Sequence, residues 1–386
     1  MIPSLCHDAL IIGGGPAGST VAIVLADAGR QVVLIEKSKQ AQHMVCGEFL
    51  SPESLPLLRR NGIYPEQLGA RTIHSVRVAA RDVLGEILLP SPALSLTRRT
   101  LNEALLRRAQ QAGASLLRGY TAESLSRQPG GEASGRWRTQ ITDSDDASIS
   151  IQGADAFLAT GKQDLHGWAR SAKGTQNGLV ALKMYFTLSP EQQAKLTGYA
   201  EIILYEGGHA GLQMVEGGCA NFYALIRQEK MKSFEGRWDR LLDHMQRCSP
   251  HLAGRLSGAV PTLERPLTIS SVPYGYCTEE SADGLSPWRL GDQAAVVPSF
   301  SGDGMAIALH TGYRAAQLYL EGSTPASFHR EVREQFERRL YWGTMLSRLL
   351  IAVPSLAQAV RVWPFVLSEI FAVTRVPEAA IRVAGL

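Results

Sequence analysis

The chain has 386 residues, with 39 Lys and Arg against 36 Asp and Glu, a formal net charge of +3. Hydrophobic residues make up 45% and charged residues 19%, which disfavours long disorder and a multi-span membrane protein. The charge is too small and too scattered to indicate nucleic-acid binding, and the length predicts about two domains.

The cysteines indicate the kind of compartment. They are odd in number, widely spaced and free of any C-x-x-C pair: Cys6, Cys46, Cys219, Cys248 and Cys277. This pattern predicts reduced thiols, with neither a disulfide framework nor a metal site. The first apolar run, residues 9–12, is shorter than the ~7–15 residues of a secretory signal core, so we expect a cytoplasmic protein.

The first thirty-odd residues have the pattern of a βαβ unit. Residues 8–12 predict a buried strand, 13–18 a turn, 19–29 a helix and 31–35 a second strand. In the turn, Gly13 permits the tight bend, Gly15 lets the backbone approach a pyrophosphate, and Gly18 lets the helix sit close to the sheet. The helix N-terminus, which includes Pro16 and Ala17, offers free N–H groups to the anion. The turn therefore predicts a dinucleotide site.

An acidic residue supports this interpretation. Glu36 follows Gly18 by 18 residues, at the end of the second strand, where a carboxylate can bind ribose hydroxyls and disfavours a 2′-phosphate. A Walker A loop is excluded because no Gly-Lys-Ser/Thr follows, which leaves a purely structural glycine turn as the alternative.

The rest of the chain divides into further segments. We expect a helix over 97–112, strands at 115–117 and 155–159, and hairpin tips at 128–135 and 143–148. Residues 179–227 alternate apolar and polar side chains and predict antiparallel sheet. A strand ending near 292 and a helix over 305–320 return the chain to the first domain.

The predicted fold is therefore α/β: a Rossmann-like cofactor domain with an inserted antiparallel-sheet substrate domain and a C-terminal helical segment. The cofactor domain would comprise 1–178 and 275–330, including substrate-side elements at about 45–95. The inserted domain would span 179–274. Residues 331–386 would form C-terminal helices that pack on the body of the protein, with contact to a membrane or a lipidic substrate as the alternative.

A second motif lies at 290–305. Asp292 at a strand end can accept hydrogen bonds from a ribityl or ribose hydroxyl. The Gly302-Asp303-Gly304 loop, which opens a helix at Met305, points bare N–H groups toward developing negative charge, such as that of a reduced flavin.

These residues resemble the FAD-dependent oxidoreductases with the para-hydroxybenzoate hydroxylase fold, and among them the geranylgeranyl reductase branch. The resemblance covers about residues 8–320. The glycine turn is similar to the family's FAD pyrophosphate loop, and Leu290–Met305 is similar to its G-D-A-A…P…G-x-G segment. Arg98-x-x-Leu101-Asn102 resembles an element that opens a helix in this fold, and Val45–Glu48 resembles a loop near the flavin. The resemblance implies these FAD contacts: Gly13, Gly15, Pro16, Ala17, Gly18, Glu36, Lys37, Cys46, Arg98, Ala122, Thr160, Gly161, Gly291, Asp292, Pro298, Gly302, Asp303, Gly304 and Met305.

Three departures from the family pattern keep alternatives open. Ala159-Thr160-Gly161 replaces an Ala-Asp-Gly motif, so electrons would come from NADH or NADPH or, alternatively, from a flavin reductase or a carrier protein. Gly211–Glu216 replaces the Trp-x-Phe-Pro element of prenyl reductases. The Trp-x-Trp-x-Ile-Pro motif of flavin-dependent halogenases is absent from the sequence, which disfavours halogenation.

We expect a monooxygenase of secondary metabolism that acts on a hydrophobic aromatic or polyketide-like molecule through a flavin C4a-hydroperoxide. C=C reduction of an isoprenoid or lipidic substrate and a non-catalytic, electron-transferring flavoprotein are the alternatives. The candidate catalytic residues are Glu48 as an acid or base, Cys46 as a redox-sensitive thiol and Phe300 as a pocket wall. Two of them also have a structural interpretation: Glu48 as a solvated or structurally paired carboxylate, and Cys46 as a small buried residue.

Overall fold

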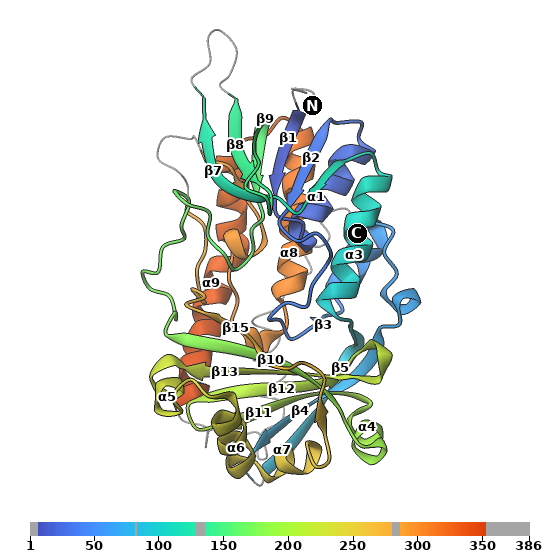
Figure 1. The fold of residues 1–386 in the computed structure, drawn as a ribbon, viewed down its shortest axis with the longest axis vertical. Helices are drawn as coiled ribbons and strands as arrows, with labels where there is room; N and C mark the ends of the chain where they lie inside the picture. The colour runs from blue at the N-terminus through green and yellow to red at the C-terminus, as the bar shows by residue number, and fades with distance from the viewer. Residues whose placement is uncertain (1–6, 82, 129–135, 280–285, 353–386) are drawn as a thin grey trace.

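The computed structural model describes residues 7–81, 83–128, 136–279 and 286–352. Two sheets lie at opposite ends of the long axis, and helices and loops connect them (Figure 1). The first sheet has the order β6-β2-β1-β9-β8-β7, and β16 also pairs with β9. Its strands are β1 (His7–Ile12), β2 (Val32–Glu36), β6 (Ser115–Arg118), β7 (Thr121–Arg127), β8 (Trp137–Thr142), β9 (Ser148–Leu158) and β16 (Trp288–Arg289).

The first sheet combines a parallel part with an antiparallel edge. β6, β2, β1, β9 and β16 pair in parallel, whereas β7, β8 and β9 form an antiparallel meander. Along β1, Ala9 and Ile11 pack into one hydrophobic cluster, and Leu10 and Ile12 pack into another. Burial on both faces is what a near-continuous apolar strand predicts in a parallel sheet. The predicted βαβ unit and the return of the chain at 288 are confirmed.

The parallel part is covered on one face by α1 (Pro16–Asp27), α3 (Arg98–Gln111) and α8 (Gly304–Leu320), which share the largest hydrophobic cluster with β1 and β2. The short α2 (Ser54–Arg60) contacts α8. The helices expected over 97–112 and 305–320 are therefore confirmed, and α3 begins with the side chain of Thr97 accepting a hydrogen bond from the Thr100 backbone N–H.

The second sheet has the order β14-β10-β13-β12-β11-β4-β5-β3, with β15 also paired to β10. Its strands are β3 (Phe49–Leu50), β4 (Arg71–Ala80), β5 (Val83–Ser95), β10 (Leu179–Thr187), β11 (Gly198–Tyr205), β12 (Gly208–Met214), β13 (Ala220–Arg227), β14 (Val260–Pro261) and β15 (Leu267–Ser270).

Two features of this sheet differ from the expectation. Residues 49–95, which we assigned to the cofactor domain as substrate-side elements, supply β3, β4 and β5 of the second sheet. The sheet is also not wholly antiparallel, because β4 and β11 pair in parallel. Both differences have one cause: strands more than a hundred residues apart in sequence meet side by side, and alternation within one strand carries no information about its neighbour.

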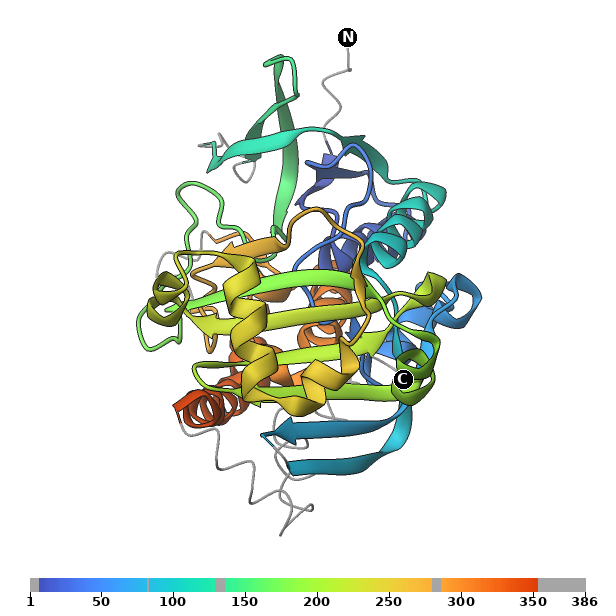
Figure 2. The ribbon, with the colours of Figure 1, turned by 60° about the horizontal axis from the view of Figure 1, so that its bottom comes forward.

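Helices cover the far face of the second sheet. Three of them, α5 (Gln228–Ser233), α6 (Trp238–Cys248) and α7 (Pro250–Arg255), follow β13 in the chain, and α6 and α7 lie across the strands (Figure 2). α4 (Pro190–Leu196) lies between β10 and β11 in sequence. The other face of the sheet is therefore the one that looks toward the first sheet. Four 3-10 segments complete the described elements: η1 (Pro65–Leu68), η2 (Glu216–Gly218), η3 (Gly291–Gln293) and η4 (Ser299–Ser301).

The long helix α9 (Pro325–Ala352) joins the two ends of the molecule. Its 28 residues span about 42 Å at 1.5 Å per residue, and it contacts β16 and α8 as well as β11 and β12 (Figure 1). The remainder of the expected C-terminal helices, residues 353–386, lies outside the described residues. Within the described part of the chain, none of the helices combines the length and hydropathy needed to cross a bilayer.

Candidate functional site

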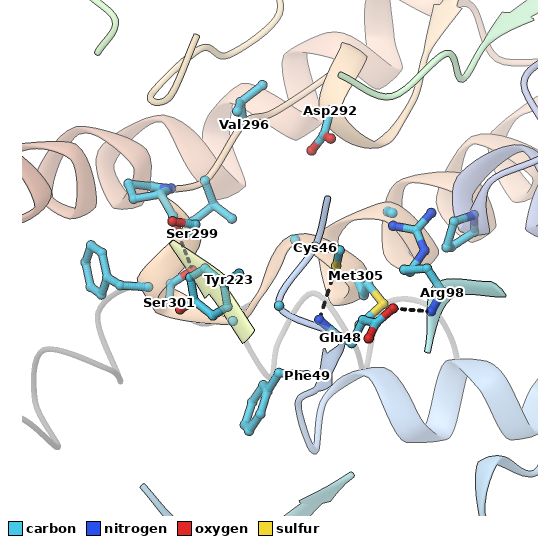
Figure 3. A pocket seen from close by; sticks show the side chains of 18 of the residues that line it. Cys46, Glu48, Phe49, Arg98, Tyr223, Asp292, Val296, Ser299, Ser301 and Met305 are labelled. Atoms are coloured by element: carbon cyan, nitrogen blue, oxygen red, sulfur yellow. Dashed lines mark hydrogen bonds between the residues drawn. The ribbon is translucent and has the colours of Figure 1, made fainter. Parts of the chain in front are cut away.

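A large cavity lies where the loops of the first sheet meet the second sheet. Its empty volume is about 1340 Å³, including space open to solvent. Many of the residues that the sequence singled out line it (Figure 3). They are Gly15, Pro16, Ala17, Cys46, Glu48, Arg98, Gly161, Gly291, Asp292, Pro298, Phe300, Gly302, Gly304 and Met305.

The glycines of the first turn have different physical roles. A Cβ on Gly13 would lie 2.3 Å from the Ala159 carbonyl oxygen, at a φ of +107°, and one on Gly18 would lie 2.0 Å from the Gly13 oxygen. The fold itself therefore requires these two glycines. A Cβ on Gly15 would approach only Arg98 Nη2, at 3.6 Å, so Gly15 leaves space that opens into the cavity.

This open space suits a diphosphate. Gly15 is the N-cap of α1, and no side chain caps the helix, so the first N–H groups of α1 are available to an anion. The Arg98 guanidinium, beside Gly15, adds positive charge. At the end of β2, the Glu36 carboxylate accepts hydrogen bonds from the backbone N–H groups of Gly14 (2.9 Å) and Ser38 (2.8 Å). These bonds fix the carboxylate and leave lone pairs for ribose hydroxyls.

The loop around Asp292 is tied to the loop after β9. Gln293 Nε2 donates to the backbone oxygens of Gly161 (2.9 Å) and Gln163 (3.0 Å). The buried Arg170 donates to the carbonyl oxygens of Lys162 and Asp292. Together these bonds hold the two loops as one unit, and the Asp292 side chain extends toward the cavity (Figure 3). This position fits a hydrogen bond to the ribityl chain of a flavin.

The segment from Pro298 to Met305 closes the cavity on one side. Gly302 has a φ of +76°, and a Cβ there would lie 2.7 Å from the Phe49 ring. Phe300 is buried, with 6% of its surface exposed, and its ring faces that of His209 at 6.3 Å. Burial lowers the pKa of His209 to about 4, so its ring is neutral at physiological pH.

Glu48 occupies an unusual position in the cavity wall. It has a φ of +59° although it is not glycine, and its side chain is fully buried. Its Oε1 lies 2.7 Å from the Arg98 backbone nitrogen, 2.7 Å from the Tyr185 hydroxyl and 2.6 Å from Lys183 Nζ. Glu48 was a candidate from its place in the sequence, but no local pattern indicated Lys183 or Tyr185, which lie on β10 of the second sheet.

The ionisable side chains around Glu48 shift one another's pKa values. Burial raises the pKa of Glu48 and lowers the pKa of Lys183, while their mutual attraction opposes both shifts. The pKa of Tyr185 is raised by burial and by the negative charge of Glu48. His43 accepts or donates a hydrogen bond at 2.8 Å between Nδ1 and the Tyr185 hydroxyl. Burial, with Arg99 and Lys183 nearby, lowers the pKa of His43 to about 4.

The second sheet supplies the opposite wall. The Tyr223 ring is held between two glycines, since a Cβ would lie 2.0 Å from it on Gly211 and 3.3 Å from it on Gly47. Asn221 Nδ2 donates to the Gly47 oxygen at 2.7 Å and fixes the loop that carries Cys46. The remaining wall is mainly apolar, with Phe49, Val76, Leu89, Ala200 and Ile202.

Several predicted contacts lie away from the cavity lining. Gly13 and Gly18 lie behind the lining, and Thr160 donates within its own loop to the Gln163 oxygen. Lys37 is exposed and pairs with Gln163, and Asp303 is buried at the N-cap of α8. Ala122 lies on β7, where it packs against the cluster of β8 and β9. Among the lining residues that no sequence pattern indicated are Glu201, Tyr223 and Tyr274.

Comparisons with known proteins agree with this geometry. Residues 7–146 match a family model described as an FAD binding domain. A menaquinone reductase of Mycolicibacterium smegmatis is 24% identical over 333 residues, which cover 82% of this chain and 76% of that protein. A squalene monooxygenase of Mus musculus is 22% identical over 320 residues, covering 78% of this chain and 53% of that protein. A solved flavin-dependent brominase superposes with a TM-score of 0.75 at 16% identity, over 96% of this chain and 93% of the other.

These findings confirm the α/β fold with a Rossmann-like FAD-binding domain and a separate substrate-side sheet. They support FAD as the cofactor and an FAD-dependent oxidoreductase as the class of enzyme. The resemblance to the geranylgeranyl reductase branch stays a prediction. The likeness to the brominase is a likeness of fold.

Proposed function

We propose that this protein is an FAD-dependent monooxygenase that transfers one oxygen atom to a hydrophobic small molecule, aromatic or polyketide-like in character. The observation that carries the proposal is the cavity itself. One side is made of the loops that fit FAD, and the other is an apolar sheet face with few polar groups. When bound, FAD supplies the redox chemistry, and the protein supplies orientation and electrostatics.

The chain's own residues would prepare such a site in two ways. Gly15, Arg98, Glu36 and Asp292 would hold the diphosphate, ribose and ribityl groups, while the Pro298–Met305 segment places the N-terminus of α8 against the cavity. The apolar wall and the cover by Phe300 would exclude water, which protects a reactive flavin from unproductive side reactions.

Oxygen labelling tests this function directly. Purified FAD-loaded protein, reduced anaerobically, is mixed with ¹⁸O₂ and a panel of hydrophobic aromatic and polyketide substrates. The expected product carries one ¹⁸O atom, and labelled water without labelled oxygen gives none. Consumption of substrate with no label in the product under either condition would overturn the proposal.

The second candidate is reduction of a C=C bond in an isoprenoid or lipidic substrate. Its specific support is the Cys46-Gly47-Glu48 loop, which places a buried carboxyl group at the cavity, together with the menaquinone reductase relative. The same experiment under nitrogen separates the two candidates. A reductase forms a product two mass units heavier than its substrate without oxygen, whereas a monooxygenase forms none.

The electron donor is a further part of the proposal. We expect NADH or NADPH to reduce the flavin, with a flavin reductase or carrier protein as the alternative. Prompt loss of the flavin absorbance on mixing with either nucleotide supports the first. If neither nucleotide bleaches the flavin but a reductase does, the second holds, and a flavin that transfers electrons without altering any small molecule indicates the non-catalytic alternative.

A further inference from the structure

The two oxygens of Glu48 have very different surroundings. Two donors and one cation converge on Oε1: the Arg98 backbone N–H and the Tyr185 hydroxyl donate at 2.7 Å, and the Lys183 ammonium group forms an ion pair at 2.6 Å. A carboxyl oxygen has two lone pairs, so Oε1 is fully used. Oε2 is buried and has no hydrogen-bond partner among the described residues. A proton held by Glu48 therefore belongs on Oε2, while the side chain lines the cavity (Figure 3).

A chain of hydrogen bonds runs from Oε1 toward solvent. Tyr185 lies 2.7 Å from Glu48 Oε1 and 2.8 Å from His43 Nδ1. Because the hydroxyl has one proton and Glu48 Oε1 can only accept it, His43 Nδ1 must be the donor to Tyr185. All the bonds then point in one direction, from His43 through Tyr185 to Glu48. His43 is only half-buried, so its ring can exchange protons with water.

Charged and titratable groups surround both ends of this hydrogen-bond chain. Glu48 faces Lys183 and Tyr185 from β10, Arg98 from α3 and Cys46 from its own loop. His43 faces Arg99, Lys183 and Glu216. Burial raises the pKa of Glu48, so this carboxyl group can hold a proton, and lowers the pKa of His43 to about 4, so its ring is neutral and can give up the Nδ1 proton while Nε2 takes one from water.

The chemistry proposed above needs such a proton. Transfer of one oxygen atom from O₂, with the second leaving as water, consumes two electrons and two protons, and so does saturation of a C=C bond. An anionic reduced flavin carries both electrons and one proton. The second proton must come from the protein or from water, and the apolar wall limits water.

We infer that Glu48 is the group that delivers this second proton into the cavity from Oε2, and that Tyr185 and His43 form the path that restores it from solvent. This inference rests on the proposed flavin chemistry in the cavity. In each turnover the O–H bond of Glu48 breaks and its proton passes to the reacting oxygen or carbon. Tyr185 then passes its hydroxyl proton to Oε1 and takes one from His43 Nδ1, and water returns His43 to its Nδ1–H form. A half-turn of the carboxyl group exchanges its two oxygens and brings the proton back to the cavity side. Lys183 keeps the resulting carboxylate paired, so it has a positioning role.

Infrared difference spectroscopy of the FAD-loaded protein tests the inference without depending on turnover. Photoreduction is followed by a jump in pH, and the C=O stretch of a protonated carboxyl group is recorded in H₂O and D₂O. We expect one such band that is absent in Glu48→Gln. In Tyr185→Phe and in His43→Gln, we expect the band to recover at least tenfold more slowly than in the wild type.

Tyr205→Phe is the matched control. Tyr205 is another buried tyrosine of the same sheet, and its hydroxyl donates to the Leu225 oxygen, in the hydrophobic cluster on the helix-covered face. Its recovery rate should equal that of the wild type. A band that survives in Glu48→Gln, or one that recovers equally fast in both path variants, would overturn the inference. The flavin absorbance of the wild type reports FAD binding separately, and if FAD does not bind, the pH jump on the FAD-free protein still reads the same band.

Discussion

The two sides of the cavity are built by different means. On the FAD side, the site is formed mainly by backbone: glycines permit the close approach of a diphosphate, and an uncapped helix N-terminus presents its N–H groups. On the side of the second sheet, side chains form the wall: Tyr223 from β13 lines the cavity, and Lys183 and Tyr185 from β10 hold Glu48 in the wall from behind. A backbone site depends on a few consecutive residues, whereas a side-chain wall depends on strand register across the whole sheet.

This difference predicts different consequences of mutation. Changes at FAD-side positions that open into the cavity, such as Gly15, should mainly alter cofactor affinity, because the space they fill is outside the packed core. Changes in the wall of the second sheet should alter stability and its dependence on pH, because the wall contains buried ionisable groups. Three variants test this division.

The largest effect is expected for Lys183→Met. The substitution removes the charged partner of a fully buried carboxyl group, a change that typically costs about 3–5 kcal/mol. Without Lys183, the strongest attraction that opposes burial is lost, and the pKa of Glu48 rises further although the bonds from Arg98 and Tyr185 remain. The folded state then binds more protons than the unfolded state above pH 4.5, so stability falls as pH rises. We expect the loss in urea midpoint to be larger at pH 8 than at pH 5.5.

The double variant Glu48→Gln/Lys183→Met is the control, since it removes both charges together. It should recover a large part of the stability and lose the pH dependence. An equal loss at both pH values in the single variant would show that Lys183 acts through packing, and the wall would then resemble an ordinary core.

The second effect concerns His209, on β12 beside the loop that covers the cavity. Its pKa is lowered by burial from 6.5 to about 4, so the unfolded state binds more protons between these values. Stability should therefore fall as pH drops from 6.5 toward 4, and a shift of about 2.5 pH units corresponds to roughly 3 kcal/mol. His209→Gln can still reach Ser299, now 3.1 Å from Nε2, and should flatten the unfolding midpoint over this range. An unchanged slope would mean that other groups control acid stability.

The same division explains what the sequence could predict. The glycine turn, Glu36 and the Asp292 loop are local patterns, and the cavity lies beside them. The sequence could not predict the partners of Glu48, because Tyr185 is 137 residues away in sequence and only the pairing of β10 with the rest of the sheet brings it close. The alternation of β10 indicated a strand, but a lysine and a tyrosine on alternate positions of a strand are usually explained by exposure to solvent. In the structure, both side chains are buried instead.

The same limit applies to the strands at 71–95. The partner of β4, which is β11, follows about 120 residues later, so no local signal assigned these residues to the second sheet. Ala122, which only the resemblance implied as an FAD contact, lies on β7 outside the cavity lining, and its contact with FAD stays a prediction.

The smallest expected effect, and the sharpest test of the FAD side, is Gly15→Val. The added side chain enters space that contains only Arg98 Nη2 nearby, so the protein should fold with an unchanged unfolding midpoint. It would nevertheless occupy the approach of a diphosphate to the helix N-terminus. We expect FAD affinity to fall at least a hundredfold, about 2.8 kcal/mol, measured by titration of the FAD-free protein.

Gly178→Val, at an exposed glycine with no atom within 4 Å of an added Cβ, should bind FAD normally. If Gly15→Val keeps stoichiometric FAD, the diphosphate does not approach α1 here, and the FAD side of the cavity is not the backbone-built site described above. If it loses FAD and stability together, Gly15 belongs with Gly13 and Gly18 as a requirement of the fold.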